Sequence, residues 1–367
     1  MLAGCNLRCC KWEDLIMCRP AYMSFPATLV AATAFLAVPA NADPKLVNPE
    51  KYNIELFADL SSQEGAPKAF QLTIADGKRS LPAGLYVTTG PLSGTHSDRI
   101  FQIEAPDKIN VFASGLESSE TMLVAEGKYG EGVLVSSPLL QQIMRVQPAS
   151  GRFETAKFGT NKVSIFGNRN TSFGTKPFGV AVLSYGPEGD LYASDWAGGR
   201  ILKIDQDGNA EVFATLPANK AGDMVAKQVM SARGVHNADG FIVSTFTIPD
   251  RDMHGLDTVY LMSADGREFT PLVEGLTGIQ LPAYGPGGEF GSGLYIPTIG
   301  SSNAADGTVY YLTEGRDLQP FLEGIDAVHV AFDTENLLGG GMFVSDFNND
   351  PDNPVTMAGK IWRITLK

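Results

Sequence analysis

The sequence predicts an all-β protein, a single six-bladed β-propeller in which the amino-terminal strand completes the carboxy-terminal blade. Three observations lead to this prediction. A β-rich segment recurs six times, a second strand-like segment follows each copy, and a segment near the start of the chain matches the strand that the last copy lacks.

The first recurring segment begins with glycine or aspartate and continues with apolar, aromatic and small residues. Its copies occupy residues 84–90, 132–138, 190–196, 240–246, 293–299 and 341–347. Their starts are separated by 48, 58, 50, 53 and 48 residues. A period near 50 residues is typical of propeller blades, and each blade holds four strands. We name these strands A to D from the central channel outward and assign the recurring segment to strand B.

The neighbouring strands of each blade follow from the same comparison. Strand C is predicted at residues 98–105, 141–148, 199–206, 257–264, 307–314 and 359–366, which are rich in branched and aromatic residues. Strand D is predicted at residues 109–116, 210–217, 269–276 and 318–325, with a degenerate copy, RFETAKFGT, after Gly151. An apolar run such as 178–183 precedes each strand B and supplies strand A.

The sixth blade lacks a strand D, because only Lys367 follows its strand C. Residues 53–60, NIELFADL, match the strand D pattern and are predicted to close the ring. Closing so long a loop costs roughly 5 kcal/mol. Burial of Ile54, Leu56 and Leu60 stabilises the ring by about 1.5–3 kcal/mol each. The alternative is a disordered amino-terminal segment.

Residues 1–42 have the pattern of a signal peptide. The apolar run 24–39 is too short for a comfortable membrane span and ends in Ala40-Asn41-Ala42, a small-x-small cleavage pattern. If translation starts at Met17, Arg19 is the positive charge before the apolar run; if it starts at Met23, Arg19 is not part of the protein. We therefore expect a periplasmic or secreted propeller domain over residues 43–367, with no membrane insertion. A buried amino-terminal helix is the alternative.

Cysteine content and charge narrow the function classes. All four cysteines (Cys5, Cys9, Cys10 and Cys18) precede residue 43, so disulfides and thiolate–metal sites are not expected in the mature domain. Three of the 28 basic and two of the 41 acidic residues lie in 1–42, which leaves 25 and 39, a net charge of −14. Such a charge repels phosphate backbones, so we expect no nucleic-acid partner. We also expect a monomer.

Candidate acid–base residues are predicted near the channel entrance. In a propeller the B–C and D–A loops share the top face, and several B–C loops here are long and polar. Aligning the A strands places Glu120, Phe178, Arg233 and His329 at equivalent positions, and His236 lies on a predicted A strand. Carboxylate, guanidinium and imidazole groups together bind anions or move protons. Solvation of the channel is the alternative role for each.

Candidate metal ligands cluster at the ends of two B strands. Asp195 and Asp346 occupy the same repeat position, at which other blades carry Ser or Thr. Asp346, Asn348, Asp350 and Asp352 recur at every second residue, the spacing of a loop that wraps a hard cation such as calcium. Turn-capping aspartates and an Asx-rich surface loop are the alternatives.

The repeats resemble those of the NHL and gluconolactonase-type six-bladed propellers. KPFGVAVLSYGPEGDLYASDWAGGRILKIDQDG, residues 176–208, is similar to their repeat, and the resemblance extends over residues 52–367. In the gluconolactonase branch, a Glu, two Asn and an Asp hold a calcium ion that polarises a lactone carbonyl. This chain has Phe178 where one Asn is expected, so the resemblance transfers only Asp195 and Asp346 as ligands.

These features leave three functional hypotheses. The first is an exported module that binds a small ligand or a protein partner with its top-face loops. The second is a calcium-dependent lactonase or esterase, with Asp346 and Asp195 as ligands and His329 or His236 as the general base. The third is a sugar dehydrogenase that resembles the soluble quinoproteins. The resemblance implies a cofactor held by basic residues and a histidine that face the channel, and Arg233 and His329 are the candidates for these roles.

Overall fold

The computed structural model describes residues 43–65, 67–77, 81–90, 98–148, 161–166, 179–219, 225–232, 239–247, 255–299, 307–347 and 359–367. All of them belong to one compact unit, Ala40–Lys367. Within these ranges, no helix has the length and apolar character needed to cross a membrane.

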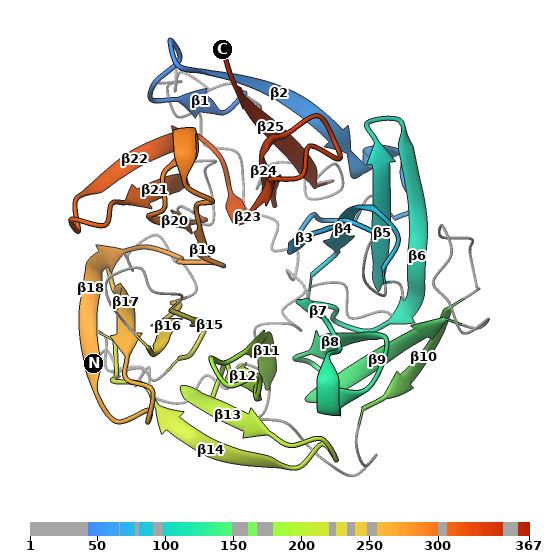
Figure 1. Cartoon of the computed structure of the whole chain (residues 1–367), viewed down its shortest axis with the longest axis vertical. Coiled ribbons are helices and arrows are strands. Elements are labelled where there is room, and N and C mark those ends of the chain that lie inside the picture. The colour runs from blue at the N-terminus through green and yellow to red at the C-terminus, as the bar shows by residue number, and fades with distance from the viewer. Residues whose placement is uncertain are drawn as a thin grey trace, which may run out of the picture. The chain divides into compact units, whose positions relative to one another are not determined.

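Six antiparallel sheets surround a central channel, as predicted (Figure 1). Blades 1 to 3 consist of β3 (Leu72–Ala75), β4 (Gly84–Thr88), β5 (Asp98–Ala105) and β6 (Lys108–Leu116); β7 (Met122–Val124), β8 (Val133–Ser137), β9 (Gln142–Pro148) and β10 (Asn161–Ile165); and β11 (Val180–Tyr185), β12 (Leu191–Asp195), β13 (Arg200–Ile204) and β14 (Ala210–Thr215).

Blades 4 and 5 consist of β15 (Gln228–Ser231), β16 (Phe241–Ser244), β17 (Asp257–Met262) and β18 (Phe269–Leu276); and β19 (Ala283–Tyr284), β20 (Leu294–Pro297), β21 (Thr308–Leu312) and β22 (Leu318–Glu323). Blade 6 consists of β23 (Ala327–Asp333), β24 (Gly341–Asp346), β25 (Lys360–Leu366) and the amino-terminal β2 (Tyr52–Asp59). The innermost strands are therefore β3, β7, β11, β15, β19 and β23, and their first residues mark what we call the upper end of the channel.

The amino-terminal strand closes the ring, as the missing strand D predicted. β2 pairs with β25 in antiparallel register, with Ile54 opposite Ile364 and Leu56 opposite Trp362 (Figure 1). The prediction that Leu56 is buried is wrong, because this residue is 46% exposed. A register shift between Leu56 and Ala58 turns Phe57 toward the core instead, where its ring packs edge-on against Phe343.

A second amino-terminal strand, β1 (Lys45–Leu46), was not predicted. It pairs with β22 and extends blade 5 to five strands. Between the two pairings, Tyr52 donates a hydrogen bond from its hydroxyl to the Glu289 carbonyl at 2.9 Å and packs against Phe290 and Phe321. The amino-terminal segment therefore joins blade 5 to blade 6.

The outer strand of blade 2 is described only from Asn161 on. The described strand that pairs with β9 is β10, and its Asn161 lies opposite Pro148. RFETAKFGT, the predicted strand D of this blade, lies outside the described residues.

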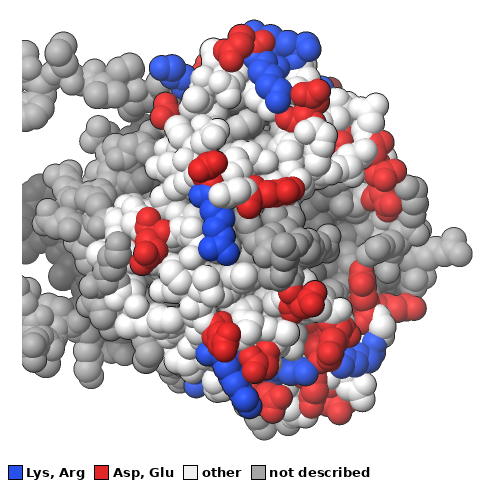
Figure 2. Space-filling model, turned by 60° about the vertical axis from the view of Figure 1, so that its left-hand side comes forward, with Lys and Arg blue, Asp and Glu red and all other residues white. Residues whose placement is uncertain are grey.

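The apolar core is divided among the blade interfaces. Six clusters of buried residues each join two neighbouring blades, and blades 6 and 1 meet through Phe57, Phe343 and Ile361 packed against Leu72 and Phe101. A seventh cluster lies on the channel axis. At the surface, acidic side chains are spread over the face in Figure 2, and several lie beside a lysine or arginine.

In blades 1, 2, 3 and 6, a hydroxyl group near the end of strand B connects the blade to the next one at the upper end of the channel. Each hydroxyl accepts a hydrogen bond from a backbone N–H of its own blade and donates one to a backbone carbonyl of the next blade, and these backbone groups lie on strand A or directly before it. These donations are Thr88 to Glu120 at 2.7 Å, Ser136 to Ala181 at 2.5 Å, Ser194 to Lys227 at 2.8 Å and Ser345 to Phe70 at 2.5 Å. In the fourth blade the corresponding Ser244 hydroxyl has no hydrogen-bond partner among the described residues. The fifth blade has Pro297 at this position, and there the Leu281 N–H donates directly to the Val328 carbonyl.

Ser345→Ala is expected to lower the free energy of unfolding by about 1–3 kcal/mol, because two buried backbone groups lose their partner. These groups are the His329 N–H, 3.0 Å from the Ser345 hydroxyl, and the Phe70 carbonyl. Urea denaturation measures the effect. Ser345→Thr is the control, because Thr88 makes the same two bonds in blade 1. A Ser345→Ala midpoint equal to that of the wild type would contradict the role of this hydroxyl.

Candidate functional site

A buried ion pair crosses the upper end of the channel. Glu120 precedes β7 in blade 2 and Lys227 precedes β15 in blade 4, so the two residues come from blades that are not adjacent. Lys227 Nζ pairs with Glu120 Oε1, and both side chains are almost fully buried, at 3% and 0% exposure. The other carboxylate oxygen, Glu120 Oε2, has no hydrogen-bond partner among the described residues.

Aromatic rings enclose the ammonium group of Lys227. The centroids of Phe70, Trp196 and Phe246 lie 5.0, 5.1 and 5.1 Å from Nζ. Cations are attracted to ring faces at such distances, and the attraction increases when water is excluded. Phe70 also belongs to the axial apolar cluster, which includes Val182, Leu281, Val328 and Phe347. Side chains therefore fill the channel axis at this end.

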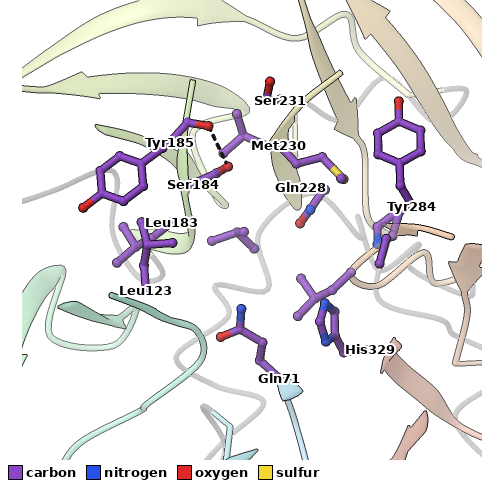
Figure 3. A pocket seen from close by; sticks show the side chains of 15 residues that line it. Gln71, Leu123, Leu183, Ser184, Tyr185, Gln228, Met230, Ser231, Tyr284 and His329 are labelled. Atoms are coloured by element: carbon purple, nitrogen blue, oxygen red, sulfur yellow. Dashed lines mark hydrogen bonds between the residues drawn. The ribbon is translucent and has the colours of Figure 1, made fainter. Parts of the chain in front are cut away.

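Below this layer, a cavity of about 360 Å³ occupies the channel (Figure 3). Residues of all six blades line it, on the innermost strands or directly before them. The lining residues are Gln71, Leu123, Val182, Leu183, Ser184, Tyr185, Gln228, Val229, Met230, Ser231, Leu281, Pro282, Ala283, Tyr284 and His329. Along β11 and β15 the first residues are buried and the last two are half-exposed, so the cavity opens toward the lower end of the channel.

His329 lies in the wall of this cavity. Its Nδ1 accepts a hydrogen bond from the Leu72 N–H at 3.2 Å, so the proton of the neutral ring is on Nε2. The ring retains some exposed surface although protein surrounds it, because that surface faces the cavity. Burial lowers the pKa of His329 to about 4. The imidazole is therefore neutral at pH 7 and is a weaker base than an ordinary histidine.

His329 is expected to make the protein less stable at acidic pH. The unfolded chain binds the proton with a pKa near 6.5 and the folded chain with one of about 4. The stability contribution is therefore complete above pH 6.5 and is lost as the pH falls toward 4, by up to about 3 kcal/mol.

The measurement compares wild type with His329→Gln by urea denaturation at several pH values. The difference between the two proteins is needed because burial raises the pKa of Asp257 to about 6, which acts in the opposite direction. The imidazole NMR signals of His329 are identified by their absence from the spectrum of the variant. Their chemical shifts should not change with pH above pH 5. Parallel pH profiles for the two proteins would show that His329 does not ionise as described.

The two described metal-ligand candidates are engaged within their own blades. Asp195 is buried and accepts a hydrogen bond from Arg200 Nε at 2.8 Å. Asp346 accepts one from the Trp362 indole at 3.1 Å and lies near the Lys68 ammonium. Within the described ranges, no group of three or more His, Cys, Asp or Glu residues could hold a metal ion.

The other predicted site residues fall outside the described part of the chain. These are Asn348, Asp350 and Asp352 among the metal candidates, and Arg233 and His236 among the acid–base candidates. Of the latter group, Glu120 and His329 are described. Relative to strand B of its own blade, Glu120 lies one residue nearer the upper end of the channel than His329 does. Glu120 therefore belongs to the layer of the ion pair and His329 to the cavity below it.

Lys227, Gln71 and Gln228 were not identified from the sequence. The alignment placed Arg233 at the position equivalent to Glu120, whereas β15 ends at Ser231 and Lys227 has the matching register. The Lys227 N–H donates to the Ser244 carbonyl, as the Glu120 N–H donates to the Ser136 carbonyl. The available signal was a polar residue one or two positions before the apolar residues of strand A, as at Glu120, Lys227 and Gln280.

Comparisons with known proteins support the fold. No protein-family model matches this sequence, and no curated protein matches it. Among solved structures, a gluconolactonase from Xanthomonas campestris is 11% identical, with a TM-score of 0.56 over 92% of this chain and 99% of that chain.

The PQQ-bound aldose sugar dehydrogenase from Streptomyces coelicolor is 13% identical, with a TM-score of 0.52 over 89% of this chain and 100% of that chain. A luciferin-regenerating enzyme is 10% identical, with a TM-score of 0.53 over 86% of this chain and 97% of that chain. These TM-scores and coverages establish a shared six-bladed propeller architecture, and identities this low leave the activity open.

Proposed function

We propose that the protein binds a small molecule in its central channel. The observation that carries this proposal is the cavity of about 360 Å³, which is lined by all six blades and contains the buried Gln228 Oε1 without a described partner. Ligand pockets have volumes of about 300–1,000 Å³ and apolar walls with a few polar groups. The wall here combines Leu123, Val182 and Leu281 with Gln71 and His329.

This proposal places the ligand below the ion-pair layer. The top-face loops, which the sequence predicted to bind a ligand or partner, lie largely outside the described residues, and that prediction stays as it was made. Entry from the lower end agrees with the half-exposed Ser184, Tyr185, Met230 and Ser231.

The test uses N-phenyl-1-naphthylamine, an uncharged dye that fluoresces when it enters an apolar cavity. We expect a saturable increase in fluorescence with one site per chain. Ser184→Trp fills the cavity from a half-exposed position and should abolish the increase. Ser164→Trp, at an exposed position on β10, is the matched control and should leave it unchanged. No saturable increase, or one that Ser184→Trp does not affect, would show that the channel is not a binding site.

A calcium-dependent lactonase or esterase is the second candidate. The alternating oxygen donors Asp346, Asn348, Asp350 and Asp352 favour it, because Asp346 ends β24 at the upper end of the channel. This candidate requires Asp346 to exchange its Trp362 hydrogen bond for the ion. Calorimetric titration with calcium should give one site that Asp350→Ala removes. Absence of calcium binding to the wild type would leave the lactonase without its electrophile.

We also propose that the protein is exported. The apolar run 24–39 and the Ala40-Asn41-Ala42 sequence support removal of residues 1–42. Leu46, four residues after Ala42, is buried against blade 5. Amino-terminal sequencing of the protein recovered from the periplasm or medium should read Asp43 first, and a start within residues 1–42 would refute this cleavage site.

A further inference from the structure

The cavity wall is electrically neutral. Among its lining residues, all within the described ranges, none is Asp, Glu, Lys or Arg, and His329 is uncharged at neutral pH. The channel charges closest in register, Lys227 and Glu120, neutralise each other at the upper end. An ion that enters such a space loses its hydration and gains no opposite charge. The electrostatics therefore favour an uncharged ligand.

Two hydrogen-bond donors are held in fixed orientations in this wall. Gln71 Oε1 accepts a hydrogen bond from the Met122 N–H at 2.5 Å, which leaves the Gln71 amide nitrogen to face the cavity. The Leu72 N–H holds His329 Nδ1, which leaves Nε2–H as the free donor of that ring. Backbone groups of blades 1 and 2 thus orient both side chains before any ligand arrives.

One acceptor faces the same space. Gln228 is 6% exposed, and its Oε1 has no hydrogen-bond partner among the described residues. Figure 3 shows Gln71, Gln228 and His329 with their polar ends turned toward a common space, whereas the hydroxyl groups of Tyr185 and Tyr284 point away from it. A buried acceptor without a partner is unfavourable, and a ligand that donates to it removes this penalty.

We propose that the ligand is an uncharged molecule with a carboxamide-like group, whose carbonyl accepts from Gln71 and His329 and whose N–H donates to Gln228. This inference rests on the proposed channel site and names its ligand class. The apolar wall formed by Leu123, Val182 and Leu281 contacts the remaining apolar part of the molecule. A carboxylate has no proton for Gln228, and an amidinium has no acceptor for the two donors.

The test uses three probes of nearly equal size and shape: benzamide, benzoate and benzamidine. Each competes with N-phenyl-1-naphthylamine on the purified wild-type protein at pH 7.5. We expect benzamide to displace the dye at a concentration at least tenfold lower than either charged probe, since each mismatch costs at least one hydrogen bond. Equal displacement by the three probes, or preferred displacement by an ion, would overturn the ligand class and leave the channel site standing. Failure of the dye itself to bind would overturn the proposed function instead.

A variant locates the acceptor. Gln228→Leu should weaken benzamide binding about tenfold, and Gln319→Leu, at an exposed position on β22, should leave it within twofold of the wild type. Thermal unfolding of both variants checks that they are folded, and the wild-type probe series decides the matter if Gln228→Leu is not. Unchanged benzamide affinity in a folded Gln228→Leu protein would show that Gln228 does not contact the probe.

Discussion

A chain that lacks residues 43–60 is expected to lose cooperative unfolding. This deletion removes β1 and β2, and with them the buried side chains of Tyr52, Phe57 and Leu60. Burial of three large apolar side chains stabilises a fold by roughly 5–9 kcal/mol, which is comparable with the whole stability of a typical domain, about 5–15 kcal/mol. The deletion also exposes the β25 edge, which is a template for aggregation. Urea denaturation followed by circular dichroism should show a broad transition or none.

A transplanted strand separates ring closure from simple loss of residues. The Lys367 N–H donates to the Lys51 carbonyl at 3.1 Å, so the end of β25 lies beside the start of β2. A chain that begins at Gln63 and carries residues 51–62 after Lys367, joined by an Asn-Gly turn, should recover a sharp transition. Deleting only residues 43–47, which removes β1 alone, should lower the melting temperature while keeping the transition cooperative. If the chain that lacks residues 43–60 unfolded as cooperatively as the wild type, closure of the ring by β2 would be disproved.

Local sequence patterns were sufficient to predict the blades. Strand B of blade 3 was predicted to end at Asp195, and the structure also ends β12 (LYASD) at this residue. Ring closure was predictable for a different reason: the count of D strands was one short, and β2 matched the missing pattern. Leu56 could not be placed by pattern alone, because the register shift beside it reverses which residues face the core.

The channel site was harder to predict from the sequence. Register shifts interrupt the pairing of β11 and β23 with their B strands, whereas β15 pairs regularly with β16. Alignment across blades therefore cannot fix the residue that faces the axis in each one. Asp195 and Asp346 were correctly placed at equivalent positions, but their partners, Arg200 and Trp362, lie on the next strand and depend on rotamers that no repeat pattern specifies.

Glu120→Gln is expected to destabilise the protein by about 3–5 kcal/mol, because it leaves the Lys227 ammonium buried without a counter-charge. Water cannot compensate, since Lys227 is 2% exposed and Phe70, Trp196 and Phe246 surround its Nζ. Lys227→Met should cost a similar amount, because the remaining carboxylate is fully buried and its Oε2 already has no described partner. Urea denaturation at pH 7 measures both changes in the free energy of unfolding.

The double variant Glu120→Gln/Lys227→Met should be more stable than either single variant. Replacing a buried ion pair by groups of similar volume is often close to neutral, because the desolvation of two charges offsets much of their attraction. A double-mutant cycle should therefore give a coupling energy of about 3 kcal/mol or more. The exposed pair Asp265 and Arg267 is the control, and Asp265→Asn should leave the denaturation midpoint unchanged within error. Additive effects of the Glu120 and Lys227 substitutions would show that the two charges do not interact across the channel, and the layer that separates the cavity from the top-face loops would then rest on apolar packing alone.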